Sequence, residues 1–211
     1  MLQVLPVKTP ILKRSFDFKL EFLHALQKNK ISLKNGDIVI VSSKILALSQ
    51  GRIVNLASVP ISARARKLKN ARFATDREEL SYIQLILDEA DAILPGRIFT
   101  VIKDGNIIPA AGIDRSNTPE GSAILWPKDS WREAEKIREL LKNKYGLRHF
   151  GVLICDSHCQ PLRLGTTGLA MAWAGFVGVQ DERKKKDLFG KKLLVTQKAV
   201  ADNLASAALL V

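Results

Sequence analysis

Apolar residues recur with the period of a helix along several stretches of the chain. A helix over 16–30 is predicted by apolar residues three or four positions apart, including Phe16, Leu20, Leu23 and Leu26. Ser/Thr residues followed three positions later by Glu predict capping boxes at Thr75 and Ser130. A basic helix is expected over 60–73, and a second helix from Thr75 to about Ala90. A third is expected from Ser130 to Tyr145-Gly146, and a last helix, capped by Thr196, over 199–211.

Strand-like runs alternate with these helices. Short apolar runs at 2–7 and 37–41 predict strands, and the run FGVLICDS (150–157) predicts a buried strand that ends in polar residues. Asp104-Gly105 lies between two β-rich runs within 99–108, which is the strongest hairpin signal of the chain. Because a hairpin makes part of the sheet antiparallel, we expect an α+β fold with a mixed or antiparallel sheet. No repeat or linker divides the sequence, so a single domain over 1–211 is predicted.

Composition adds a basic character to this picture. The 211 residues include 33 Lys and Arg against 21 Asp and Glu, a net charge of +12, which favours a polyanionic partner such as a nucleotide or nucleic acid. The basic run 64–72 has no interleaved aromatic residues, so nucleic acid is possible but not favoured. Two cysteines, no signal peptide and no apolar run of about 18 residues predict a cytoplasmic protein with no membrane association.

The segment from Cys155 to Cys159 allows four interpretations, of which the plainest is a strand that enters a turn, with Asp156 capping that turn. A catalytic thiol would need a base and a polarised site, and His158 and Cys159 are neighbours whose side chains point to opposite faces of a strand. A zinc site would need a second pair of ligands, which the sequence does not supply near Cys155, His158 and Cys159. The remaining interpretation is a metal and phosphate site, in which Asp156 and Ser157 provide hard oxygen ligands at the end of the strand.

Other loops offer groups that could complete a phosphate site. Arg163 and the run Gly165–Gly168 could approach an anion, and Asp114 with Asn117 could face Asp156 if the loops converge. Each of these has a plain alternative, since Asp and Asn at such positions also stabilise their own turns. The usual phosphate-binding loops, G-x-x-x-x-G-K-[ST] and G-x-G-x-x-G, are absent, so a nucleotide would have to be held in another way.

Four segments in sequence order resemble the coenzyme F(420) gamma-glutamyl ligase family: GDIVIVSSKI…SQGRIVNL, AAGIDRSN…EGSAILWP, GVLICDS…PLRLGTTGLAMAWAGF, and DLFGKKLLVTQKAVADNLASAALL. The resemblance covers the chain from Leu5 to Leu210. It implies a mixed α/β fold of the family's own type, a homodimer, and a ligase that depends on GTP and on Mg²⁺ or Mn²⁺. It further implies that the enzyme joins L-glutamate to a deazaflavin carboxylate through an acyl phosphate. ATP in place of GTP and a folate-like acceptor remain alternatives, as does a non-catalytic homologue that binds nucleotide or nucleic acid.

The resemblance also implies roles for particular residues. Asp114, Asp156 and Ser157 match metal ligands of the family, whereas Ser43, Lys44 and Asn117 match nucleotide contacts; no catalytic residue is assigned. The sequence departs from the family pattern at Ala110, where the family usually has Asn, at Leu48, where it often has Lys, and over Ser157–Gln160. The chain also ends at Val211, so we expect it to lack the C-terminal extension with the family's Gly-Glu-Gly loop.

Overall fold

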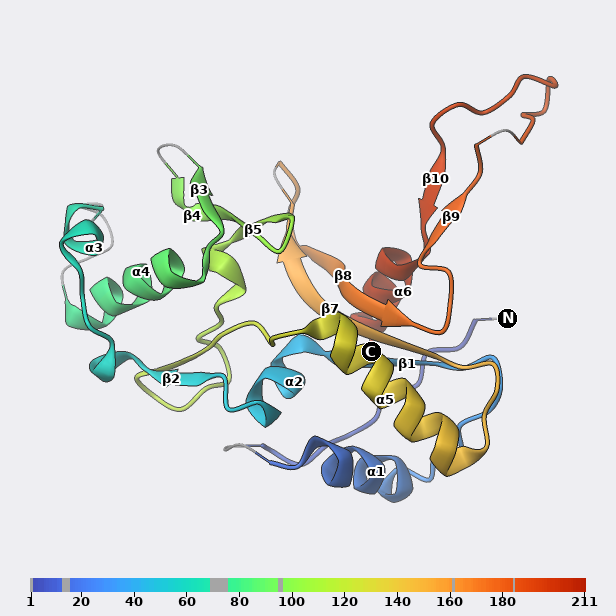
Figure 1. Cartoon of the computed structure of the whole chain (residues 1–211), viewed down its shortest axis with the longest axis horizontal. Helices are drawn as coiled ribbons and strands as arrows, with labels where there is room; N and C mark the ends of the chain where they lie inside the picture. The colour runs from blue at the N-terminus through green and yellow to red at the C-terminus, as the bar shows by residue number, and fades with distance from the viewer. Residues whose placement is uncertain (1, 13–15, 69–75, 95–96, 161, 184) are drawn as a thin grey trace. The chain divides into compact units, whose positions relative to one another are not determined.

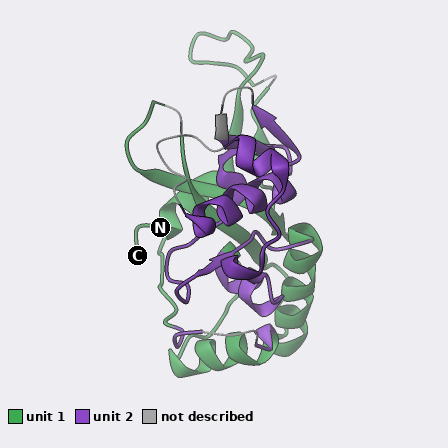
Figure 2. Ribbon diagram, turned by 90° about the vertical axis from the view of Figure 1, so that its left-hand side faces the viewer, with its two compact units in different colours: residues 1–8, 19–43, 129–211 green, residues 9–18, 44–128 purple. Residues whose placement is uncertain are grey.

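The computed structural model describes residues 2–12, 16–68, 76–94, 97–160, 162–183 and 185–211. The chain divides into two compact units, which Figure 2 shows in different colours. Unit 1 comprises residues 1–8, 19–43 and 129–211, and unit 2 comprises residues 9–18 and 44–128. Helices and strands occur in both units, and the α+β class predicted from the sequence is confirmed.

Unit 1 is built on a three-stranded sheet in the order β1-β7-β8 (Figure 1). Strand β1 (Ile38–Ser42) pairs in parallel with β7 (Gly151–Cys159), with a register that ends at Ser42↔Cys155. Strand β8 (Thr166–Ala174) pairs with β7 in antiparallel orientation along nearly its whole length. The first five residues of β7 are all buried, which explains why this run is continuously apolar rather than alternating.

Three helices and a two-stranded arm complete unit 1. Helix α6 (Val200–Ala208) packs on the sheet face that carries Leu153 and Cys155. Helix α5 (Ser130–Tyr145) contacts β7 and β8, and α1 (Phe18–Lys28) lies at the start of the unit's second segment. Strands β9 (Val179–Asp181) and β10 (Gln197–Ala199) form an antiparallel pair, and the loop between them extends away from α6 (Figure 1). We call residues 179–199 the arm.

Unit 2 contains two small antiparallel sheets. Helix α2 (Ser43–Ser49) leads into β2 (Ile53–Asn55), which pairs with β6 (Ser122–Ile124). The second sheet has the order β3-β4-β5; its strands are β3 (Ala92–Leu94), β4 (Arg97–Lys103) and β5 (Asn106–Pro109). Helices α3 (Ala63–Lys67) and α4 (Arg77–Glu89) and the short 3₁₀ turns η1 (Leu56–Ser58) and η2 (Ala110–Gly112) surround these strands.

The core of unit 2 brings α4, both sheets and η2 together. Its fully buried members include Ile86 of α4, Val101 of β4 and Ala111 of η2. The predicted hairpin at Asp104-Gly105 is confirmed: the two residues have φ values of 48° and 73° and join β4 to β5, as expected for a turn in which both central residues are left-handed.

Several predicted boundaries are wrong. Residues 2–7 form no strand, because the prolines at positions 6 and 10 supply no backbone donors for a ladder. Helix α5 starts at Ser130, but the capping position is Asp129, with a φ of 51°. Thr196 does not cap the last helix, since the strand β10 lies between them and Ala199 stands at the cap of α6.

The remaining helix predictions hold in large part. The side chain of Asp76 accepts a hydrogen bond from the Glu79 amide and caps α4, next to Thr75, which lies outside the described residues. The basic helix predicted over 60–73 is present as α3, and its part from 69 onward lies outside the described residues. No helix among the described residues is long and apolar enough to cross a membrane.

Candidate functional site

A strained turn delivers Asp114 to the surface of unit 2. Ala110, Ala111 and Gly112 have φ values of 50°, 54° and 71°, so three successive residues are left-handed, a conformation that disfavours side chains other than Gly, Asn and Asp. A Cβ atom on Gly112 would lie 2.1 Å from Nε1 of Trp126, so only glycine fits there. Beyond the turn, the backbone of Asp114 exchanges two hydrogen bonds with Ile124, of 2.9 and 2.8 Å. The Asp114 backbone is therefore fixed on both sides.

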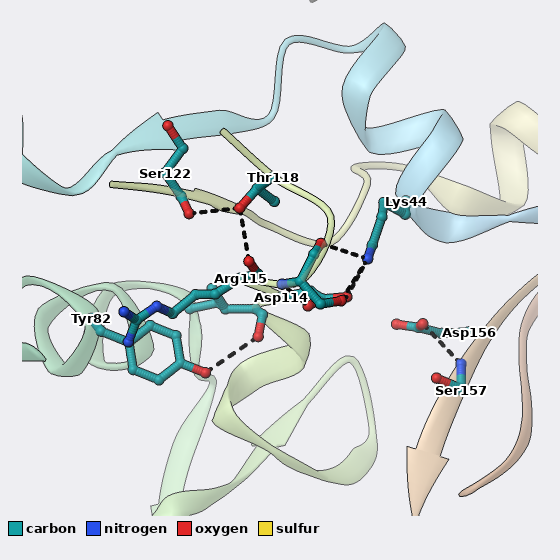
Figure 3. A network of polar contacts seen from close by, with 10 residues as sticks. Lys44, Tyr82, Asp114, Arg115, Thr118, Ser122, Asp156 and Ser157 are labelled. Carbon is teal, nitrogen blue, oxygen red and sulfur yellow. Dashed lines mark hydrogen bonds and ion pairs between the residues drawn. The ribbon is translucent and has the colours of Figure 1, made fainter. Parts of the chain in front are cut away.

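Lys44 and Ser116 surround the Asp114 carboxylate, and Figure 3 shows the Lys44 side chain directed at Asp114. Lys44 forms an ion pair with Oδ2 of Asp114. The Ser116 amide donates to Oδ1 at 2.6 Å, and the Ser116 hydroxyl donates to Oδ2 at 3.0 Å. Lys44 Nζ also donates to the Ser116 carbonyl at 3.0 Å and to the Ser116 hydroxyl at 3.1 Å. These three residues form one polar cluster within unit 2, which we call the Asp114 cluster.

The electrostatics of the Asp114 cluster favour the ionised carboxylate. Partial burial is the largest single effect and disfavours the charge, but the hydrogen bonds from Lys44 and Ser116 together outweigh it. They hold the pKa of Asp114 below its ordinary value of 3.8. Asp114 is therefore an anion at neutral pH, as a metal ligand has to be.

A second group of residues joins the Asp114 loop to α4. Arg115 donates to Glu78 at 2.5 Å and to Glu79 at 3.1 Å, and its guanidinium lies over the Tyr82 ring, 5.3 Å from the centroid. The Tyr82 hydroxyl donates to the Ile113 carbonyl at 3.3 Å, and burial raises the pKa of this phenol. We did not predict these residues from the sequence; the only signal was an Arg directly after Asp114.

Asn117 and Thr118 complete the loop. Asn117 is exposed and left-handed, with a φ of 54°, a conformation that asparagine adopts more readily than most residues. The Thr118 hydroxyl contacts the carbonyls of Arg115 and Ser122, at 2.8 and 3.0 Å. The backbone requirement alone accounts for an Asn at 117, and its contact with a nucleotide stays a prediction.

Asp156 and Ser157 lie on β7 in unit 1. Asp156 is the first residue of β7 past the parallel register with β1, and the Ser157 amide donates to its Oδ1 at 2.8 Å. The strand does not end there, as we had predicted, but continues to Cys159 because β8 pairs with it. Asp156 therefore stands where the parallel pair ends and the two-stranded extension begins.

Ser43 is the residue at which unit 1 passes into unit 2. It begins α2 directly after β1 and is buried, with 2% of its surface exposed. Ser43, Asp156 and Ser157 belong to unit 1, whereas Lys44, Asp114 and Asn117 belong to unit 2. The structure brings Lys44 into contact with Asp114, and the convergence of Asp114 with Asp156 stays a prediction.

Cys155 does not have the features of a nucleophile. Cys155 is buried against Ala201 and Ala205 of α6, and burial, with the negative charge of Asp156, raises its pKa to about 11. A thiol with that pKa is almost entirely protonated at neutral pH. Cys159 is exposed at the end of β7. The burial of Cys155 thus favours a structural role over thiol catalysis for this residue.

Within the run from Gly165 to Gly168, Gly168 has a packing role. A Cβ on Gly168 would lie 2.3 Å from the backbone of Ala205 and Ser206, and the Gly168 amide donates to the Ser206 hydroxyl at 3.1 Å. This amide is therefore engaged by α6 rather than open to a phosphate. Glycine at 168 allows α6 to approach β8 closely.

His158 lies on the same strand face as Asp156, since residues two apart point the same way. Among the described residues, Nδ1 of His158 and Oγ1 of Thr167 are buried without a hydrogen-bond partner. The two residues stand opposite each other in the register of β7 and β8. As predicted, His158 lies on the strand face opposite to that of Cys159.

The donor groups in both units suit a hard cation. Carboxylate, hydroxyl and carbonyl oxygens are present at Asp114 and Ser116 in unit 2 and at Asp156 and Ser157 in unit 1, and these are the ligand types that Mg²⁺ and Mn²⁺ prefer. In the part of the chain that the structure describes, no three His, Cys, Asp or Glu residues gather into a metal-binding group. Within each unit, the few oxygen donors fit a cation that takes most of its ligands from water and phosphate, which is the usual way in which Mg²⁺ binds.

Comparison with known proteins gives one consistent result. The family model described as F420-0:Gamma-glutamyl ligase matches residues 6–211. Relatives named coenzyme F420:L-glutamate ligase include a protein of Haloarcula marismortui, 37% identical over 85% of this chain and 71% of its own length. The relatives of the same name from Archaeoglobus fulgidus and Methanocaldococcus jannaschii are 34% and 32% identical to this chain. Each match covers 98% of this chain and 80% of the relative.

Proposed function

Because the chain belongs to the F420-0:gamma-glutamyl ligase family, we propose that it forms an amide bond between the amine of L-glutamate and a carboxylate of coenzyme F420 or its precursor. GTP is the proposed energy source, and Mg²⁺ or Mn²⁺ the proposed metal. The observation that carries the proposal is the Asp114 cluster, in which a cationic Lys44 and an ionised Asp114 lie in direct contact. A lysine at the phosphates and a carboxylate at the metal recur in enzymes that transfer phosphoryl groups, and the Asp114 cluster supplies both residue types.

The proposed reaction has two steps. An acceptor carboxylate oxygen attacks the γ-phosphorus of GTP, the bond to the β–γ bridging oxygen breaks, and an acyl phosphate and GDP result. The glutamate amine then attacks the acyl carbon, the C–O bond to phosphate breaks, inorganic phosphate leaves, and the nitrogen loses a proton to give the amide. A divalent ion, when bound, neutralises phosphate charge during the transfer.

The residues of this chain have distinct proposed tasks. Lys44 acts as a point charge toward the phosphates, and Ser43 and Asn117 contact the nucleotide. Asp114 supplies a carboxylate from unit 2, and Asp156 with Ser157 supplies oxygen ligands from unit 1. The fixed backbone of Asp114, held by Ile124 and by the turn over Trp126, supports this assignment because a ligand has to be positioned before the metal arrives.

Calorimetric titration of GTP, and then ATP, with and without Mn²⁺ tests the nucleotide and metal part of the proposal. We expect binding of GTP that depends on Mn²⁺ and is abolished by Asp156→Asn, with an unchanged melting temperature. Binding of ATP instead of GTP would change the co-substrate. If Asp156→Asn binds GTP as tightly as the wild-type protein in the presence of Mn²⁺, Asp156 is not part of the site.

A second measurement separates the ligase from a non-catalytic homologue. The protein is incubated with GTP, Mn²⁺, L-glutamate and a deazaflavin acceptor, and the mass of the acceptor is followed. An increase by one glutamate residue with release of GDP is expected. Nucleotide binding without product for either a deazaflavin or a folate acceptor would favour the binding protein, for which the +12 net charge is the supporting observation.

We also propose that the protein is a homodimer and that the arm contributes to the interface. Four large apolar side chains in the arm expose between 76% and 99% of their surface; these are Leu188, Phe189, Leu194 and Val195. The base of the arm is held by Glu182, whose carboxylate contacts Lys185 at 2.6 Å and Lys198 at 3.3 Å. Apolar side chains presented on an extended hairpin are typical of a surface that another protein chain covers.

A further inference from the structure

The Lys44 ammonium has all of its hydrogen-bonding capacity filled by the Asp114 cluster. It contacts Oδ2 of Asp114, the carbonyl of Ser116 at 3.0 Å and the hydroxyl of Ser116 at 3.1 Å. An ammonium group has three protons, so three oxygens satisfy it completely. Only 26% of the Lys44 side chain is exposed, so the contact is partly shielded from solvent.

The same three oxygens are the ones that a cation would use at Asp114. Carboxylate, carbonyl and hydroxyl oxygens converging on one point are a ligand set for a hard metal ion. The second carboxylate oxygen of Asp114 is engaged by the Ser116 amide at 2.6 Å. A divalent ion that approaches Asp114 therefore meets a carboxylate whose charge is neutralised and whose oxygens are occupied.

Displacement of Lys44 requires another anionic partner for the ammonium. A free metal ion offers none, and two cations cannot share the three oxygens without strong repulsion. A nucleotide brings phosphate oxygens, which are good partners for a lysine. The metal and the nucleotide then favour each other's binding, and this coupling is reciprocal by necessity.

We propose that Lys44 keeps the Asp114 cluster closed to free divalent ions and opens it when a phosphate group accepts the ammonium, so that the metal enters as a metal–nucleotide complex. This inference rests on the proposed function and specifies how the site is regulated. Lys44 thereby discriminates between a free metal ion and a metal bound to nucleotide.

Titration of Mn²⁺ without nucleotide, followed by the electron paramagnetic resonance signal of free Mn²⁺, tests the proposal. We expect Lys44→Met to bind Mn²⁺ up to about fivefold more tightly than the wild-type protein, since a partly exposed ion pair is worth at most about this factor. Adding Asp114→Asn to Lys44→Met should abolish the gain. In the presence of GTP the wild-type protein should bind Mn²⁺ more tightly than without it, and Lys44→Met should have lost most of this coupling.

Two control variants separate the closed cluster from bulk charge. Lys128→Met removes the same charge from an exposed position in unit 2 and should leave Mn²⁺ binding unchanged. Lys44→Arg keeps a cation at the site and should not gain affinity. Lys44→Gln repeats the test if the methionine variant melts at a lower temperature than the wild-type protein.

An unchanged or weaker Mn²⁺ affinity of folded Lys44→Met, or an equal gain in Lys128→Met, would overturn the proposal. Failure of GTP to bind the wild-type protein would overturn the proposed function instead. The nucleotide-free comparison of Lys44→Met with wild type decides the role of Lys44 in either case.

Discussion

The neighbours of Asp114 keep its carboxylate ionised at a lower pH than an ordinary aspartate, because they lower its pKa, and this has a consequence for stability against acid. Lys44 and Ser116 lower its pKa in the folded protein below the ordinary value of 3.8. A depressed folded pKa means that the Asp114 contribution to stability is present above about pH 3.8 and is lost as the pH falls through the folded pKa. We expect the free energy of unfolding of Asp114→Asn to be lower than that of wild type at neutral pH, and this difference to be smaller at a pH below 3.8.

Urea denaturation at both pH values measures this difference. Solvent screens the ion pair between Lys44 and Asp114, because these residues expose 26% and 40% of their side chains. We therefore expect only a small difference in the free energy of unfolding. Glu120→Gln, at an exposed position of the same loop, is the control, since it removes a carboxylate that Lys44 does not contact. A difference between wild type and Asp114→Asn that does not change with pH would contradict the ion-pair explanation.

Gly112 is the position at which a single methyl group disrupts the approach to Asp114. Alanine there would combine a φ of 71° with a Cβ 2.1 Å from the Trp126 indole. We expect Gly112→Ala to lower the free energy of unfolding by about 2–5 kcal/mol, the sum of the left-handed and overpacking penalties. Gly121→Ala has a similar φ of 69° in open space, and should cost only about 1–2 kcal/mol. Equal losses in thermal or urea unfolding would show that the indole contact is unimportant.

The identity of the candidate residues was easier to predict than their contacts. A polar residue after a glycine in a loop, together with the resemblance to a family, was enough to select Asp114. The contact of Lys44 with Asp114 joins positions 70 residues apart and depends on the packing of unit 2, which no local pattern encodes. The contact of Arg115 with Tyr82 was missed for the same reason, because α4 precedes the loop by some 30 residues.

Strands and helices followed local patterns wherever those patterns were strong. The hairpin at Asp104-Gly105 was predicted correctly because both turn residues tolerate a positive φ. The end of β7 was predicted wrongly, because its last four residues are polar or exposed. They belong to the strand only through their pairing with β8. The prediction at Thr196 failed because three residues after it pair with β9 before α6 begins.

Close packing of α6 on β8 depends on Gly168. A methyl group at this position would meet the backbone of Ala205 and Ser206 at 2.3 Å, and a backbone cannot yield as a side chain can. We expect Gly168→Ala to lower the free energy of unfolding by about 1–3 kcal/mol. Thr166→Ala, at the exposed start of β8, should change it by less than about 0.5 kcal/mol. Chemical denaturation of both variants is the measurement, and a neutral Gly168→Ala would mean that α6 does not pack this closely in solution.

The chain as a whole is basic and carries an apolar arm, and these two features favour different partners. The net charge of +12 attracts phosphorylated ligands over a distance set by the salt concentration. The arm presents Leu188, Phe189 and Leu194 with at least 76% of each side chain exposed. Salt does not weaken burial of such surface, so an interface formed by the arm should persist where charge attraction is screened.

A triple variant of the arm, Leu188→Ser, Phe189→Ser and Leu194→Ser, tests whether the arm holds a dimer together. We expect the wild-type protein to have the mass of a dimer in light scattering coupled to gel filtration, at low and high salt, and the variant to have the mass of a monomer. The physical reason is that the three substitutions remove most of the apolar area that the arm would bury on association. Burial of such area contributes about 25 cal/mol per Å² to the free energy of association. Leu162→Ser with Leu164→Ser removes equally exposed leucines from the turn between β7 and β8 and should leave the dimer intact. A wild-type monomer at every concentration would refute the dimer, whereas a dimer that survives the triple variant would place its interface outside the arm.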